Sequence, residues 1–129
     1  MGQPAAKQGD RITAVDTHII QPPPPATPVP VPHNFNGIID GGLSSDVNIE
    51  GRPAATVNST ATNTPPHIPQ GGTFVNPPKN KGQIIRGSAT VFINGKPAAR
   101  AGDTALTCND PSDLPVGAVV AQSRVMIGG

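Results

Sequence analysis

The sequence predicts an all-β fold, a small conical domain of three β-hairpin units arranged about a pseudo-threefold axis. Three observations support this prediction. The apolar residues are mostly Ile, Val and Ala, of which the β-branched ones favour strands. No stretch shows sustained helical periodicity. One short motif occurs three times along the chain. A length of 129 residues suits a single domain over residues 1–129.

The repeated motif is Pro-Ala-Ala, which begins at Pro4, Pro53 and Pro97. Similar segments precede the second and third copies, VNIEG at 47–51 and VFING at 91–95. A related segment, VMIG at 125–128, has no Pro-Ala-Ala after it, whereas the first Pro-Ala-Ala has no such segment before it. We therefore expect the two ends of the sequence to lie together and to complete the third unit jointly.

Each preceding segment contains two short Ile and Val runs separated by Gly, Ser, Asp or Arg, a pattern that predicts a β-hairpin. Before the second motif, the run at 37–39 leads to the run at 47–49. The motif proline lacks an amide donor, so it fits the start of a strand or a bend. Long Pro-rich loops, at 21–32, 64–69 and 76–78, are expected to join the units and to converge on the point of the cone.

The predicted core is thin, because the chain has three Phe and neither Trp nor Tyr. Its 17 Pro and 15 Gly leave disorder as an alternative, but the low net charge of +1 favours a folded chain. A domain so poor in large apolar groups needs an additional source of stability, such as a bound metal or a partner surface. The single cysteine excludes an internal disulfide.

The rare residues follow the repeat. His18 and His67 each lie 14 positions after their motif proline, and Cys108 lies 11 after Pro97. His33, at the far end of the first Pro-rich loop, is the fourth candidate. Three His and one Cys suit tetrahedral zinc, and four protein ligands leave no open position for catalysis, so we predict one structural zinc ion. The alternative is that the histidines are solvated or that the site binds metal only adventitiously.

Other functions are disfavoured. The carboxylates are scattered and every His is assigned to the metal, so we expect no enzyme. A net charge of +1 without a basic cluster predicts no nucleic-acid partner. The N-terminus has no apolar signal-peptide core, and no stretch is long enough to span a bilayer. Assembly in the cytoplasm is the expectation.

The run Pro97-Ala98-Ala99-Arg100 resembles the PAAR-repeat family, named after Pro-Ala-Ala-Arg, and the likeness covers nearly the whole chain. Only this copy is complete, because Lys7 and Thr56 take the place of the arginine in the others. No essential role is therefore assigned to Arg100.

The resemblance implies a spike-tip protein that caps a trimeric VgrG-like spike, one cap per trimer, in a type VI secretion system or a related phage-tail-like injector. It also implies zinc near the point, delivery outside the cell or into the target cell, and a target membrane that is pierced but not stably bound. The Pro-rich loops are candidate contacts for effector or adaptor proteins. An alternative is a zinc-stapled β binding or adhesin module unrelated to injection.

Overall fold

The computed structural model of the protein describes residues 2–129, and every regular element in that range is a β-strand, which confirms the predicted all-β class. The strands are β1 (Gln3–Pro4), β2 (Arg11–Gln21), β3 (Val29–Gly41), β4 (Asn48–Ile49), β5 (Arg52–Pro53), β6 (Thr60–Asn63), β7 (Thr73–Phe74), β8 (Lys81–Ile84), β9 (Phe92–Ile93), β10 (Lys96–Pro97), β11 (Thr104–Thr107), β12 (Leu114–Val120) and β13 (Met126–Ile127). Within the described range, no helix has the length and apolar character needed to cross a membrane.

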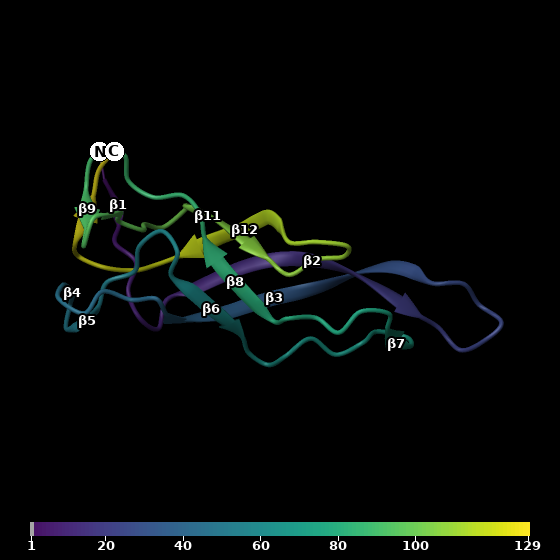
Figure 1. Cartoon of the computed structure of the whole chain (residues 1–129). Coiled ribbons are helices and arrows are strands. Elements are labelled where there is room, and N and C mark those ends of the chain that lie inside the picture. The colour runs from purple at the N-terminus through teal and green to yellow at the C-terminus, as the bar shows by residue number, and fades with distance from the viewer. Residues whose placement is uncertain (1) are drawn as a thin grey trace.

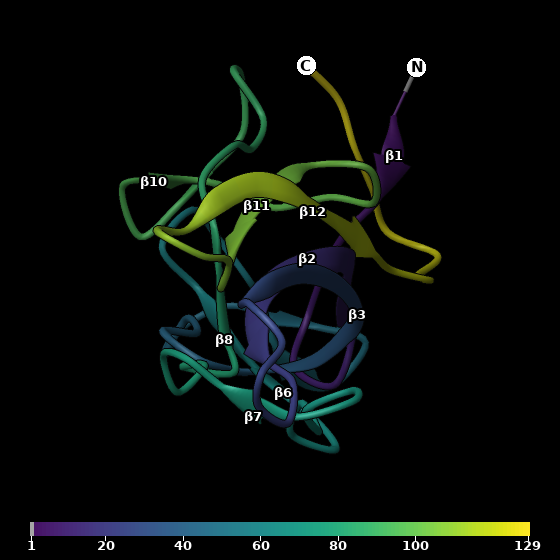
Figure 2. The same ribbon diagram turned by 90° about the vertical axis from the view of Figure 1, so that its right-hand side faces the viewer.

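Six strands close into a small barrel. Their order is β2, β3, β6, β8, β11, β12 and back to β2, and every neighbouring pair is antiparallel. The body tapers from a broad end that carries β1, β4, β5 and β9 to a narrow end formed by the β2–β3 ribbon (Figure 1). We call these ends the base and the tip. Figure 2 looks onto the tip, where the β2–β3 ribbon projects toward the viewer. The predicted cone is confirmed.

The three Pro-Ala-Ala motifs form a closed ring of backbone hydrogen bonds on the base side of the barrel. The Ala6 amide donates to the Ala99 carbonyl (3.0 Å), the Ala99 amide to the Ala55 carbonyl (3.1 Å), and the Ala55 amide to the Ala6 carbonyl (3.0 Å). Each motif therefore binds the next one, and the third binds the first. The three equivalent hydrogen bonds are arranged around the predicted pseudo-threefold axis.

Three short strand pairs form the base: β4 with β5, β9 with β10, and β13 with β1. In the third pair Gln3 lies opposite Ile127, so strands from the two ends of the sequence complete one unit. Figure 1 shows the N and C labels side by side at the base. The prediction that the ends lie together and form the third unit is confirmed.

The composition of the hairpins differs from the prediction. The apolar run at 37–39 lies in β3 and pairs with β2 and β6, whereas the run at 47–49 contributes β4, which pairs with Arg52–Pro53. The reason is the two-residue turn: φ is positive at Glu50 and Gly51 (50° and 83°), as it is at the equivalent Asn94 and Gly95 (52° and 78°). Such a turn folds each second run directly onto its own motif.

The first predicted Pro-rich loop is shorter than expected. Residues 29–32 belong to β3, with Pro32 opposite Thr17 and Pro30 opposite Ile19, so only residues 22–28 form the loop. Proline is tolerated here because β6 pairs with β3 only from Gly37 onward, which leaves this part of β3 beside β2 alone. The tip is therefore a two-stranded ribbon over much of its length.

The core consists of small threefold layers of Ala, Ile and Val. The layers are Ala5, Ala54 and Ala98; Ile49, Ile93 and Ile127; Ala6, Ala55 and Ala99; Ile12, Ala61 and Ala105; and Ile39, Ile84 and Val119. On the tip side these layers give way to Phe35 and then to polar side chains. Beyond the site the apolar core is sparse: Ile20 of β2 is fully buried there, whereas Val29, opposite it on β3, is 40% exposed.

Candidate metal site

Strand periodicity places two donor residues of β2 inside the barrel. The buried residues of β2 include Ile12, Asp16, His18 and Ile20, which share one face because alternate strand residues point the same way. His18 is one of the predicted ligands. Asp16 was not predicted, although its spacing of two residues from His18 is the signal that could have identified it.

The other predicted residues come from the remaining units. His67 lies in the segment after β6, and Cys108 directly follows β11. His33 lies within β3, opposite Asp16 in the β2–β3 register. All of these side chains are nearly or fully buried, with exposed fractions between 0 and 5%.

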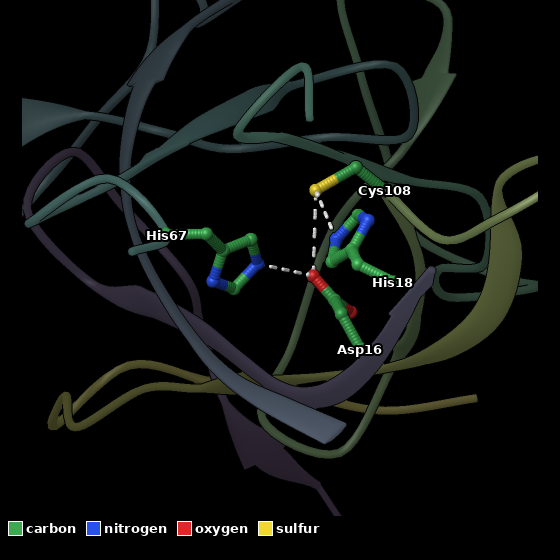
Figure 3. Close-up of side chains that lie close together, drawn as sticks. All are labelled: Asp16, His18, His67 and Cys108. Atoms are coloured by element: carbon green, nitrogen blue, oxygen red, sulfur yellow. Dashed lines mark hydrogen bonds and ion pairs between the residues drawn. The ribbon is translucent and has the colours of Figure 1, made fainter. Parts of the chain in front are cut away.

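Four donor groups meet closely: Asp16, His18, His67 and Cys108 (Figure 3). Their donor atoms all lie within 4.8 Å of one another. The distance from Asp16 Oδ2 to His67 Nε2 is 2.9 Å, and the Cys108 thiol donates to the same oxygen at 3.4 Å. Cys108 Sγ lies 3.7 Å from His18 Nε2. The structure thus brings three of the four predicted ligands together, with a carboxylate among them.

His33 lies next to this cluster. Its ring centroid is 5.6 Å from that of His18 and 5.5 Å from that of His67. Its Nδ1 lies 2.9 Å from the Val31 carbonyl, which makes this nitrogen the protonated one. Its Nε2 is buried without a hydrogen-bond partner. The structure therefore offers five donor residues for one ion.

A shell of polar groups holds the donors in place. The Thr107 hydroxyl donates to Asp16 Oδ1, and the Asn109 amide lies 3.4 Å from the same oxygen. On the outer side of His18, Nδ1 lies 3.6 Å from Asp110 Oδ2. Carboxylates and hydroxyls in this position orient metal-binding residues in many proteins.

Burial sets the protonation of two donors. It lowers the pKa of His18, against the opposing effect of Asp110, and so favours the neutral imidazole that binds metals. Burial, and next the nearby Asp16 carboxylate, raise the pKa of the Cys108 thiol to about 11. The thiol is therefore protonated at neutral pH unless a cation stabilises the thiolate.

The donor set fits a metal ion. Beside the cluster, His33 Nε2 is buried without a hydrogen-bond partner, which is costly unless another group satisfies it. Imidazole, thiolate and carboxylate are all common ligands of divalent transition metals. The cluster of Asp16, His18, His67 and Cys108 could therefore hold a metal ion.

Two grooves border the site. One of about 600 Å³ is lined by His33 and His67 together with Pro32, Pro65 and Pro66. The other, of about 620 Å³, is lined by His18 and Cys108 together with Pro77, Pro78 and Pro111. The prolines border both grooves, so the walls around the donors have restricted backbone freedom.

No curated protein matches the chain. The family model for the PAAR motif matches it twice, at residues 30–111 and 75–129, and the two matches together reach from 30 to the end of the chain. The overlap reflects the internal repeat, because the full Pro97-Ala98-Ala99-Arg100 copy lies in both. This family comprises structural spike-tip proteins rather than enzymes, which supports a general role at the tip of a secretion-type spike. By this match, by its ring of Pro-Ala-Ala motifs and by its conical β-fold, the chain belongs to the PAAR-motif family.

Proposed function

We propose that this protein caps and sharpens the trimeric VgrG-like spike of a type VI secretion system or a related contractile injection machine. The observation that carries the proposal is the closed ring of Ala6, Ala55 and Ala99, which gives one chain three similar faces. Such a chain can dock on a true threefold axis without leaving one side unmatched. One cap then serves one trimer.

The base offers an apolar surface in the same symmetry. Val47, Val91 and Val125 occupy equivalent positions, and each is 36–40% exposed. Their carbonyls accept equivalent hydrogen bonds, from Ala54, Ala98 and Ala5 respectively. Phe92 and Met126, which follow Val91 and Val125 in the chain, are each more than half exposed and enlarge this apolar surface. These side chains suit the end of a β-helical trimer, where apolar groups and unpaired strand edges need cover.

One structural zinc ion ties the tip half of the cone together. His18, His67 and Cys108 provide three ligands, and the fourth position falls to His33 or to Asp16. Ligands from all three units would join the strands where the apolar core ends. Structural zinc contributes on the order of 10–16 kcal/mol of apparent binding energy to folding, which would offset the small core.

The narrow β2–β3 ribbon is the leading point. It pierces the target membrane without binding it stably, and its prolines limit the backbone freedom that would blunt it. The protein assembles on its spike in the cytoplasm, and the machine delivers it outside the cell or into the target cell. Effector or adaptor proteins attach through the Pro-rich loops.

The test is binding to the cognate spike trimer, measured by size-exclusion chromatography with light scattering. We expect one cap per trimer. Replacing Val47, Val91 and Val125 together by Asp should abolish the complex, because three charges would be buried at the interface. The matched control is Val116→Asp, on the flank of the barrel, where the side chain is similarly exposed.

Absence of a complex between the wild-type protein and its trimer would contradict the proposal. It would instead favour a zinc-stapled binding module outside an injection machine. Equal loss of binding in the base variant and in the Val116→Asp control would place the contact surface somewhere other than the base.

A further inference from the structure

We infer that the outer face of β12 is a docking surface for one acidic, amphipathic segment of a second protein. The surface is made of apolar side chains of β12 and one of β2, and we call it the apolar flank: Val15, Leu114, Val116, Ala118 and Val120. It lies on the side of the barrel and not on the base. The inference therefore goes beyond the proposed function, because it adds a partner that a cap could carry while its base is occupied.

The apolar flank is open to solvent although most of its side chains are large. The four larger ones are between 43 and 58% exposed. Burial alternates along β12, where Gly117 and Val119 face the barrel interior and the residues on either side of them face outward. In Figure 2, β12 crosses the outside of the barrel next to β11.

Strand pairing makes the apolar surface continuous across three strands. Val120 lies opposite Arg11 of β2. Farther along β2, Val15 points to the same outer side as Arg11, because alternate residues of a strand share a face. On the other side of β12, Leu106 of β11 faces outward between two buried neighbours. A continuous exposed apolar surface is typical of interaction sites, whereas isolated apolar side chains on a surface are ordinary.

The pseudo-threefold arrangement shows that the fold does not require this apolar face. A buried glycine marks the same place in β3, β8 and β12, and each lies opposite a member of one core layer: Gly37 opposite Ile12, Gly82 opposite Ala61, and Gly117 opposite Ala105. The outward residues around these glycines are Asn36, Ile38 and Asp40; Lys81, Gln83 and Ile85; and Val116, Ala118 and Val120. The first two sets contain charged or amide side chains, whereas the third is entirely apolar. The apolar face of β12 is therefore specific to one unit.

This difference between the units sets the number of partners. Three equivalent flanks would suit a partner with threefold symmetry, whereas one apolar flank in three suits one asymmetric partner. The exposed valines of the base, by contrast, occupy equivalent positions in all three units. The occupant of the apolar flank is thus a single segment, one per cap.

The charge at one edge of the apolar flank favours an acidic partner. Arg11, beside Val120, donates to the neutral side chain of Asn36 at 3.2 Å. Among residues 2–129, no carboxylate lies within ion-pair distance of the Arg11 guanidinium. This guanidinium can therefore pair with a carboxylate of the partner.

A groove at the other edge carries a second such cation. It has a volume of about 220 Å³ and is lined by Leu106 together with Lys79, Lys81 and Asp113. Lys79 is already paired with Asp113 at 2.7 Å. Lys81 donates to the Thr62 hydroxyl at 2.8 Å and, within the described part of the chain, forms no ion pair. An apolar surface with an unpaired cation at each edge complements a segment that has an apolar face and carboxylates beside it.

A second copy of this chain is a poorer occupant of the apolar flank. It would bring matching apolar side chains, but it would also bring the same unpaired cations, Arg11 and Lys81. Like charges across a contact oppose association. An acidic segment neutralises both cations instead.

The first experiment compares the three equivalent outer positions by photocrosslinking in the cells that produce the protein. The whole chain carries Val116→benzoylphenylalanine or, as matched controls, the same replacement at Asn36 or at Lys81. We expect one crosslinked protein from position 116 and none from the two controls. Mass spectrometry maps the crosslinked segment, which should have Asp or Glu beside its apolar residues.

The second experiment measures the affinity of a synthetic peptide of the mapped segment for the purified cap, by fluorescence anisotropy. Val116→Asp should weaken binding by about 10-fold or more, because it places a charge at the centre of an apolar contact. Arg11→Glu should weaken binding and reduce its dependence on salt. Lys96→Glu, the same change of charge at the exposed base hairpin, is the control and should leave the affinity unchanged.

Three results would overturn the inference: no crosslink specific to position 116, a crosslink between two copies of the chain, or a mapped segment without acidic residues. Peptide binding that Val116→Asp does not weaken would overturn it as well. Spike binding separates this inference from the proposed function. If wild-type protein fails to bind its trimer but keeps the crosslink at 116, only the proposed function fails. If Val116→Asp loses the trimer, the flank belongs to the spike interface and the inference fails.

Discussion

The backbone of Gln3 pairs with that of Ile127, and this pair takes the place that Arg52 and Ile49 occupy in one unit and Lys96 and Ile93 in another. Two of the three base hairpins close through a covalent two-residue turn. The third is held by strand pairing alone, supported by the Ala5 amide, which donates to the Val125 carbonyl at 2.9 Å.

A circular permutant should therefore fold. If a short glycine linker joins the ends and the chain is opened at the Glu50–Gly51 turn, one covalent turn is exchanged for another and all pairings are kept. We expect a melting temperature within about 5 °C of the wild type, which corresponds to about 1 kcal/mol for a domain of this size. Opening the chain at Gly37, which pairs on both sides within the barrel, should prevent folding. Equal stability of both permutants would contradict the assigned equivalence.

The alanine ring should not tolerate larger side chains. Ala99 is 0% exposed and its amide and carbonyl both belong to the ring. Ala99→Val adds two methyl groups at the axis and should lower the free energy of unfolding by about 1–3 kcal/mol. Ala118→Val, at an exposed position of β12, is the control and should change it by less than about 0.5 kcal/mol. Urea unfolding measures both values, and a neutral Ala99→Val would show that the ring is not close-packed.

The fourth motif position supports the turn that follows each motif. The Asp103 carboxylate accepts from the Arg100 amide at 2.7 Å and from its guanidinium, whereas in the second unit the Ser59 hydroxyl accepts from the Thr56 amide at 2.9 Å. Asp103→Ala leaves the partly buried Arg100 amide unpaired and should lower the free energy of unfolding by about 1–3 kcal/mol.

The second unit supplies a matched control for this prediction. The double variant Arg100→Thr with Asp103→Ser copies the residues of Thr56 and Ser59, restores an acceptor for the amide and should cost less than Asp103→Ala alone. Thermal melts compare the two. If the double variant is the less stable one, the guanidinium, which also donates to the Gly128 carbonyl at 3.1 Å, matters more than the turn.

Removing the metal should destabilise the tip half of the cone. Chelation should lower the melting temperature of the wild-type protein, because the buried donors then lose their common partner. Cys108→Ser should bind zinc weakly and melt near the temperature of the chelated wild type, with no further change on adding chelator. Mass spectrometry under native conditions gives the zinc content of each sample. A wild-type melt that chelator does not shift would contradict a structural role for the ion.

Much of the fold could be predicted from the sequence because the repeat is local and exact enough to align. The spacing of Pro4, Pro53 and Pro97 led to the ring and to the joined ends, both of which the structure confirms. The predicted hairpin pairing is wrong because the two-residue turn at Asn94–Gly95, like that at Glu50–Gly51, pairs each second run with its own motif. The first loop is shorter than predicted because Pro30 and Pro32 alternate with valines in a strand that has a single neighbour at this point, where proline is tolerated.

The sequence by itself thus determined the pseudo-threefold arrangement and assigned His18, His67 and Cys108 to one unit each. It could do so because each of these residues lies 11 or 14 positions after its own motif proline. Only the tertiary structure decided how Asp16 and His33 lie relative to that site. Both depend on the register between β2 and β3, which sets them opposite each other, and on contacts to Asp16 from the other two units. Such contacts join residues far apart in the chain, and no local pattern fixes them.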